Sequence, residues 1–275
     1  MKIRAGYEIS YECPQPTPMI LMLSVHPSRI ADLLTPDRMR TAPALAANEY
    51  RDSFGNTCHV IHAPAGRLML SADFLIQDSG ATDDVKPDAE QHALEKLPVD
   101  TLVYLLGSRY CETDRFTAIA WSTFGKVPRG WKLVQAICDY VHDRLKFGYE
   151  HASPTKTAWD AHAERRGVCR DFAHLAITLC RCMNIPARYC TGYLGDIGVP
   201  VEDTPMDFSA WFEAFLGDRW YTFDARHNVP RIGRILMARG RDATDVAIVT
   251  SFGPCMLAGF QVVTDEVADP PARHG

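Results

Sequence analysis

One cysteine near the middle of the chain has the surroundings of a reactive thiol. Cys169 lies in the stretch RRGVCRDFAH, two positions after Gly167, where a helical spacing of apolar residues starts. Three arginines are close to it in sequence: Arg165, Arg166 and Arg170. A helix N-terminus and nearby positive charge both lower the pKa of a thiol, and the thiolate is the attacking form. From these residues alone, Cys169 is either a catalytic nucleophile or an inert cysteine at a helix start.

Two neighbours of this cysteine have simpler interpretations. Asp171 lies in the first turn of the predicted helix, where a carboxylate favours the helix, so capping explains it better than catalysis. Gly167 has no side chain, and we therefore expect another segment or a substrate to approach closely there.

The elements that would carry these residues follow in a clear order. In residues 130–147, GWKLVQAICDYVHDRLKF, apolar residues recur at three- and four-residue steps, which predicts an amphipathic helix. The same spacing predicts a second helix over residues 170–183. The patterns of ARYCTGYLG, FSAWFEAFL, RWYTFD, ATDVAIVTSFG and MLAGFQVVTDEV predict strands, with a hairpin turn at Gly217-Asp218. Residues 99–275 are thus predicted to form one domain of helices packed on an antiparallel sheet.

The first part of the chain has a different pattern. Residues 1–78 contain alternating segments such as KIRAGYEISY and GRLMLSADFLIQD, separated by turn residues, which predicts a small β-sandwich or a partly closed barrel. Residues 79–98 are polar and acidic with weak periodicity, and we expect a linker there. The expected fold class is α+β, with a β-sandwich-like domain ahead of the core.

Bulk composition limits the classes of function. The chain has 275 residues, of which 47% are hydrophobic, and a formal net charge of −5. This charge argues against a general nucleic-acid or anionic-membrane binder, so neither is expected as a partner. The opening MKIRAGYEISYE lacks the apolar core of a signal peptide, and the longest apolar run is too short to span a bilayer. We therefore expect a cytoplasmic protein, and its oligomeric state stays open.

The nine cysteines do not form a recognisable framework. Their count is odd and no secretion signal is visible, which argues against a disulfide scaffold. Cys138, Cys180 and Cys190 lie in apolar segments and are expected in the core. Cys180 and Cys182 would point in different directions on a helix, and no second pair follows with zinc-like spacing. We expect neither a metal nor an organic cofactor.

Longer motifs around Cys169 resemble a known family. The segments GVCRDFAHLAITLCRCMNIPARYCTGYL and MDFSAWFEAFLGDRWYTFDARHN resemble the bacterial transglutaminase-like superfamily, whose members share a papain-like Cys-His-Asp core. The likeness extends to GRDATDVA and to the N-terminal segment with DSFGN, so it covers most of the chain. It implies a cysteine peptidase, an amidase or a cross-linking enzyme, with a peptide or another amide-containing molecule as substrate.

The resemblance transfers to individual positions only in part. Cys169 matches the family nucleophile, and Asp224, at the end of RWYTFD, matches the carboxylate that orients the histidine. The family's histidine belongs before Ala210-Trp211, in a pattern like Asp-x-His-Ala-Trp, and this chain has Ser209 there. Serine has no proton that titrates near neutral pH, so Ser209 cannot act as a general base unaided.

Another histidine is one way to replace the missing imidazole. His227 is the best substitute among the ten histidines because it lies three residues after the matched aspartate, although an ordinary turn residue explains it equally well. His174 is five positions after the nucleophile and would point away from it on a helix, so we expect it in the core. His151 and His162, which precede the nucleophile, stay open as candidates for the base. His59 and His62 are expected to lie far from the site.

Two further accounts of the site stay open beside a substitute histidine. In the first, the thiolate is stable enough to act with weak or water-mediated acid–base help. In the second, the site has lost its catalytic activity and become a binding pocket. We expect a cysteine peptidase or amidase that forms a thioester at Cys169 and uses Asp224, with His227 as the substitute base and Ser209 at the position of the family's histidine. The rival is a catalytically impaired, transglutaminase-like binding protein. The basic run 231–242, RIGRILMARGRD, is either a solvated face or a contact for a carboxylate-bearing peptide or cell-wall fragment.

Overall fold

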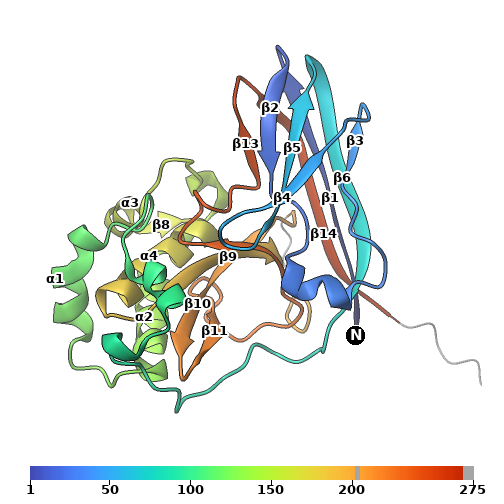
Figure 1. The fold of residues 1–275 in the computed structure, drawn as a ribbon. Helices are drawn as coiled ribbons and strands as arrows, with labels where there is room; N and C mark the ends of the chain where they lie inside the picture. Colours follow the sequence, from blue (N-terminus) through green and yellow to red (C-terminus); the bar gives the residue numbers. More distant parts are fainter. Residues whose placement is uncertain (202–204, 269–275) are drawn as a thin grey trace, which may run out of the picture.

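The computed structural model describes residues 1–201 and 205–268, and its first part is a sandwich of two four-stranded sheets (Figure 1). The strand order is β14-β1-β6-β3 in one sheet and β13-β2-β5-β4 in the other. A short 3-10 helix, η1 (Pro27–Asp32), follows β2. The eight strands are β1 (Lys2–Cys13), β2 (Thr17–Leu21), β3 (Arg40–Ala42), β4 (Asn48–Arg51), β5 (Thr57–Ala63), β6 (Gly66–Gln77), β13 (Val249–Ser251) and β14 (Met256–Val267).

The alternation seen in the sequence sets which face of each strand is buried. In β1, Ile3, Ala5 and Ile9 are fully buried, and β1 pairs antiparallel with β6 along its whole length. Strand β6 also buries every second side chain, because successive residues of a strand point to opposite faces. The predicted β-sandwich over residues 1–78 is therefore present.

The end of the chain completes this sandwich. Strand β14 pairs antiparallel with β1, so that Lys2 lies opposite Val267, and β13 pairs with β2. The prediction that residues 99–275 form one core domain was wrong at its C-terminal end, because residues 249–267 belong to the N-terminal sheets. The sequence pattern identified these segments as strands, but a strand's pattern does not identify its partner. The pairing also brings Cys13 Sγ within 2.7 Å of Cys255 Sγ.

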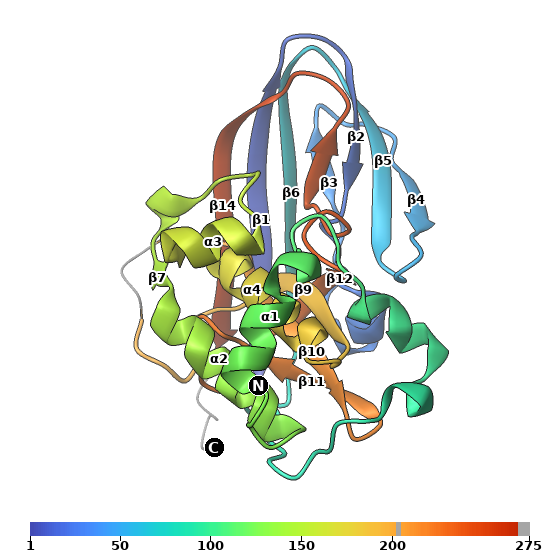
Figure 2. The same cartoon turned by 90° about the vertical axis from the view of Figure 1, so that its left-hand side faces the viewer.

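The second part packs helices on one antiparallel sheet of order β11-β10-β9-β12 (Figure 2). Helix α4 contacts β9 and β10, and the other three helices pack around α4. Its strands are β9 (Ala187–Tyr193), β10 (Ser209–Leu216), β11 (Arg219–Phe223) and β12 (Ile235–Gly240). Its helices are α1 (Thr113–Phe124), α2 (Trp131–Arg144), α3 (Ala158–Glu164) and α4 (Cys169–Cys182). The short elements are η2 (Leu94–Lys96), η3 (Val99–Leu105), β7 (Lys146–Phe147), η4 (Tyr149–His151) and β8 (Arg166–Gly167).

Local sequence explains most of this core. Helices α2 and α4 lie where the apolar spacing predicts them, and α1 and α3 are additional. The turn between β10 and β11 places Gly217 and Asp218 at positive φ, as a two-residue hairpin turn requires. The observed fold confirms the expected α+β class with an N-terminal β domain.

The two parts share one hydrophobic cluster. Tyr193, Phe208 and Ile235 of the core region are buried in the cluster that fills the sandwich. The connecting segment 79–98 is held against the core, because Thr82 forms a β-bridge with Ile232 and the Ala89 carbonyl accepts the N–H of Trp131 at the start of α2. Within the described residues, no helix combines the length and apolar character needed to cross a bilayer.

Candidate active site

Cys169 is the first residue of α4, and its neighbours build the start of that helix. An Asp171 carboxylate oxygen accepts a hydrogen bond from the Val168 N–H at 2.9 Å, and Asp171 is fully buried. A Cβ on Gly167 would lie 2.6 Å from this side chain, so a glycine is needed there. The capping interpretation of Asp171 is confirmed, and the segment that approaches Gly167 closely is the cap itself.

The three arginines next to Cys169 in sequence interact with other groups. Arg166 pairs with Glu164 at 3.5 Å, and Arg165 ends α3 in a left-handed conformation. Arg170 bonds to the Ser153 carbonyl and lies over the ring of Tyr110. The expectation that these arginines favour the thiolate was therefore wrong. The reason is that consecutive residues at a helix start point in different directions.

The surroundings of Cys169 raise the pKa of its thiol. The residue is partly exposed, yet burial of the thiol raises its pKa to about 11, and the carboxylate of Asp207 acts in the same direction. The Arg226 guanidinium and a hydrogen bond from the Ala210 N–H oppose this rise. The helix N-terminus also favours the thiolate. A thiol with this pKa is neutral near pH 7 and needs a base to take its proton.

Asp224 and His227 form a close pair in the turn after β11. The Nδ1 of His227 lies 2.8 Å from Asp224 Oδ2, and Asp224 Oδ1 accepts the backbone N–H of His227 at 3.1 Å. Because the carboxylate holds Nδ1, Nε2 is the ring nitrogen left for proton transfer. A short turn thus supplies both an imidazole and the group that orients it.

Two residues that the sequence did not single out extend this pair. Arg234 Nη2 donates to Asp224 Oδ2 at 2.9 Å, and its Nε donates to Asp83 Oδ2 at 2.9 Å. Burial acts to raise the pKa of Asp224, but Arg234 and the hydrogen bond from His227 outweigh it and hold that pKa below its usual value. Asp224 is therefore a carboxylate at any pH near neutral. In the sequence, Arg234 lies in a basic run and Asp83 in an expected linker. Neither pattern indicates that these residues contact Asp224 or each other.

One small cavity brings the candidate residues together. Its volume is about 40 Å³, and Cys169, Ser209 and His227 all line it, together with Asp207 and Arg226. Asp224 lies behind the histidine, 3% exposed at its side chain. Ser209, at the position where the resemblance expects a histidine, is the first residue of β10 and faces the same cavity. The four predicted site residues are thus gathered in one place.

The other histidine candidates lie elsewhere. His174 is fully buried between the rings of Tyr110 and Tyr189, and burial lowers the pKa of its imidazole to about 3. Its expected core position is confirmed. His151 and His162 do not line the cavity of Cys169, and His162 instead contacts Tyr140 at 3.0 Å. His59 lies on β5 in the sandwich and His62 follows on the same strand.

The arginines of the basic run 231–242 differ in their exposure, and Arg231 lines the cavity of Cys169. Arg231 and Arg234 are only 4% and 8% exposed, and the Arg231 guanidinium donates to the Gly195 carbonyl at 2.9 Å. Arg241 pairs with Asp245 at 2.8 Å. A solvated face was therefore wrong for the buried Arg231 and Arg234, whereas contact with a carboxylate-bearing peptide or cell-wall fragment stays a prediction.

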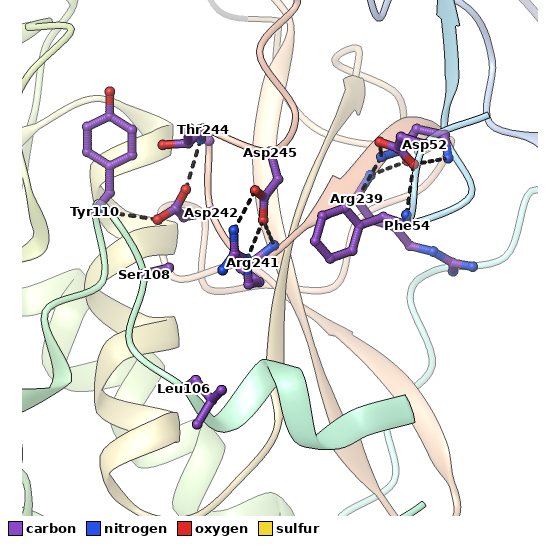
Figure 3. A network of polar contacts seen from close by, with 12 residues as sticks. Asp52, Phe54, Leu106, Ser108, Tyr110, Arg239, Arg241, Asp242, Thr244 and Asp245 are labelled. Carbon is purple, nitrogen blue, oxygen red and sulfur yellow. Dashed lines mark hydrogen bonds and ion pairs between the residues drawn. The ribbon is translucent and has the colours of Figure 1, made fainter. Parts of the chain in front are cut away.

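The GRDATDVA segment forms a polar network that supports the core (Figure 3). Asp242 accepts the N–H groups of Tyr110 and Thr244, each at 2.8 Å. The N–H of Ala243 donates to Nε2 of His174 at 3.1 Å. None of these residues lines the cavity of Cys169. This motif therefore positions α4 and the loop before α1, and it does not belong to the candidate site.

Comparisons with known proteins identify one family of similar sequences and structures. The family model described as the transglutaminase-like superfamily matches residues 119–225, a range that includes Cys169, Ser209 and Asp224. A crystal structure of a "Putative Cysteine Protease" from Cytophaga hutchinsonii is 29% identical, with a TM-score of 0.86, and the match covers 98% of this chain and 92% of that one. Residues 119–225 therefore form a transglutaminase-like region. The resemblance seen in the sequence is confirmed, and the match to the Cytophaga structure includes the sandwich.

Two further relatives add less. The "Uncharacterized protein ML0607" of Mycobacterium leprae is 27% identical over 224 residues, covering 77% of each chain. The periplasmic domain of TgpA from Pseudomonas aeruginosa, in its form bound to ethylmercury, is 19% identical over 80% of this chain and 75% of that one. Its TM-score of 0.37 is too low to support a conclusion about this transglutaminase-like chain.

Proposed function

We propose that this transglutaminase-like protein is a cysteine peptidase or amidase with Cys169 as nucleophile, His227 as base and Asp224 as the group that orients the base. A transglutaminase-like region implies peptide or protein substrates. The observation that carries the proposal is the shared cavity of Cys169 and His227, in which Asp224 holds Nδ1 of the ring at 2.8 Å. His227 thus lines the cavity of the nucleophile from the turn after β11, although β10 carries Ser209.

The proposed reaction uses only groups of the chain and water. Nε2 of His227 takes the thiol proton of Cys169 as the sulfur attacks the amide carbonyl carbon. The C–N bond breaks, and the leaving amine takes that proton from His227, which leaves a thioester at the sulfur. Water then attacks the thioester, the C–S bond breaks, and the products are a carboxylic acid and the free thiol. The N–H of Cys169 at the start of α4 is a suitable donor to the developing oxyanion.

An activated ester tests this proposal without knowledge of the natural substrate. With p-nitrophenyl acetate we expect a burst of p-nitrophenol, close to one equivalent, followed by a slower steady release. Cys169→Ala should abolish the burst. His227→Gln should slow it by at least about 100-fold, which is the usual contribution of a general base.

Matched variants show whether these effects belong to the site. Cys255→Ala removes the other partly exposed cysteine, and His151→Gln removes a histidine outside the cavity, so both should retain the wild-type burst. A burst that survives in Cys169→Ala, or one lost equally in Cys255→Ala, would contradict the proposal.

The second candidate function is a binding protein without catalysis. The raised pKa of the Cys169 thiol and the serine at position 209 favour it. In that case, wild-type protein and Cys169→Ala would release p-nitrophenol at the same slow rate. Peptides would then bind without being cleaved, which equilibrium dialysis and mass spectrometry would detect.

A further inference from the structure

Ser209 lines the same cavity as Cys169, and its hydroxyl has no hydrogen-bond partner among the described residues. Ser209 is 6% exposed, and its Oγ makes no hydrogen bond to any residue within 1–201 and 205–268. A buried hydroxyl that makes no hydrogen bond is costly, so such groups normally bond to a water or a ligand. Ser209 lines the cavity of Cys169, and we therefore place that partner in the cavity.

The cavity has the size and the lining to hold a water molecule. Its volume of about 40 Å³ exceeds the roughly 10–15 Å³ that one ordered water needs. Besides Ser209, it is lined by Cys169, Asp207 and His227, which bring a sulfur, a carboxylate and an imidazole to the same space. Buried waters typically make about three hydrogen bonds, and this lining offers enough groups for that number.

We propose that Ser209 holds the water that resolves the thioester, and that it thereby directs this site to hydrolysis instead of acyl transfer to an amine. The inference rests on the proposed function, in which Cys169 carries the acyl group. A water bound at Ser209 is in place when the thioester forms, whereas an amine must arrive from solvent. Holding one reactant in position favours its reaction over that of a competitor.

Hydrolysis of the thioester needs only groups of this chain and one water molecule. Ser209 Oγ accepts a hydrogen bond from the water, and the water oxygen attacks the thioester carbonyl carbon. Nε2 of His227 takes a proton from the water as the new C–O bond forms. The C–S bond then breaks, the sulfur of Cys169 takes the proton from His227, and the acyl group leaves as a carboxylic acid.

Partitioning of an acetyl group between water and an added amine tests this assignment. Wild-type protein and Ser209→Ala are given p-nitrophenyl acetate with a fixed concentration of hydroxylamine, and acetate and acetohydroxamate are measured. For Ser209→Ala we expect an unchanged burst, a steady rate without hydroxylamine about fivefold lower, and a ratio of hydroxamate to acetate about fivefold higher. These changes correspond to the loss of about one hydrogen bond to the attacking water.

Two variants separate this role from a general effect on the fold. Ser209→Thr keeps a hydroxyl and should retain the wild-type product ratio. Ser10→Ala removes a serine of similar burial from β1 in the sandwich and should change neither the burst nor the ratio.

The outcomes separate failure of this inference from failure of the proposed function. If Ser209→Ala gives a normal burst and the wild-type product ratio, Ser209 does not hold the attacking water and the inference is overturned. If wild-type protein gives no burst, or if the burst survives in Cys169→Ala, the proposed function is overturned and the inference with it.

Discussion

In the proposed reaction, one proton passes from the thiol of Cys169 to the ring of His227. The surroundings of the two groups determine whether this transfer precedes the attack on the substrate or accompanies it. Burial raises the pKa of the Cys169 thiol to about 11, with Asp207 adding to the rise. The sulfur is therefore protonated near neutral pH. In this mechanism His227 accepts the proton during the attack, and a stable thiolate–imidazolium pair does not form beforehand.

The pH dependence of alkylation tests this order of events. We expect the rate at which iodoacetamide modifies Cys169 to rise continuously from about pH 6 toward pH 11, because only the thiolate reacts. Asp207→Asn should move the curve to lower pH, since the Asp207 carboxylate disfavours the thiolate. Mass spectrometry of the peptide that contains Cys169 distinguishes it from the other cysteines.

A buried carboxylate far from the site gives the control for this experiment. Asp37 accepts the N–H of Val25 in the sandwich, so Asp37→Asn should leave the alkylation curve of Cys169 unchanged. A plateau of the wild-type rate below about pH 8 would show that the ion pair is already formed and would contradict the expected order.

At the scale of elements, the turn after β11 carries both an imidazole and the carboxylate that holds it, whereas the family pattern places its histidine and its aspartate on two strands. Asp224 accepts the N–H groups of Arg226 and His227 at 3.0 and 3.1 Å, so the carboxylate shapes the turn that carries its own histidine. Arg234, just before β12, and Asp83, from the connecting segment, fix the same carboxylate from behind. The position of the imidazole thus depends on three separate segments of the chain.

Removal of Arg234 should destabilise the protein strongly. Its side chain is 7% exposed and neutralises both Asp224 and Asp83, so Arg234→Ala leaves two carboxylates without their cation. We expect a loss of about 3–5 kcal/mol in the free energy of unfolding, measured by urea denaturation. Arg241→Ala breaks a more exposed pair with Asp245 and should cost about 1 kcal/mol or less. Equal losses of unfolding free energy in Arg234→Ala and Arg241→Ala would contradict the role of Arg234 in neutralising two buried carboxylates.

Asp224 should also contribute to the acid dependence of stability. Its folded-state pKa is lower than the value of about 3.9 for an unfolded aspartate. Its contribution is therefore complete above that value and is lost as the pH falls below it. Asp224→Asn should be less stable than wild type at pH 7, and its free energy of unfolding should decline less between about pH 5 and pH 2. Asp218→Asn, at an exposed turn, should retain the wild-type acid dependence, and a steep decline in Asp224→Asn would contradict this assignment.

Features that depend on residues close together in the sequence could be predicted, and features that depend on distant segments could not. Helix α4, the hairpin at Gly217-Asp218 and the cap at Asp171 depend on neighbouring residues, and all were predicted. His227 was chosen for its distance from Asp224 along the chain, and the structure does bring it to the cavity, although its role as base stays a prediction. The places of Arg234 and Asp83 depend on contacts between distant segments, which no local pattern encodes.

At the scale of the whole molecule, the sandwich and the core are joined by a common interior. Tyr193 of β9 and Ile235 of β12 are fully buried in the same cluster as the sandwich strands. Tyr193 packs edge to face on Phe74 of β6, with ring centroids 5.6 Å apart. Two regions with such a shared interior should unfold together.

A charge placed in the sandwich tests this coupling. Val262 of β14 is 4% exposed, so Val262→Asp buries a carboxyl in an apolar cluster and should cost at least about 3 kcal/mol. Trp131 and Trp159 of the core should report the same single unfolding transition as far-ultraviolet circular dichroism, at a lower midpoint than in wild type. Gln261→Asp, at the exposed neighbouring position, should leave the midpoint nearly unchanged. Two separate transitions in Val262→Asp would show that the core folds independently.

The pairing of β14 with β1 has a consequence during translation. Strand β1 is synthesised long before β14, so one flank of β1 lacks its neighbour until residues 256–267 have left the ribosome. An unfilled strand flank attracts other polypeptides. The nascent chain therefore exposes an unpaired edge of β1 while the helices and the second sheet are synthesised, and pairing with β14 removes this risk of association.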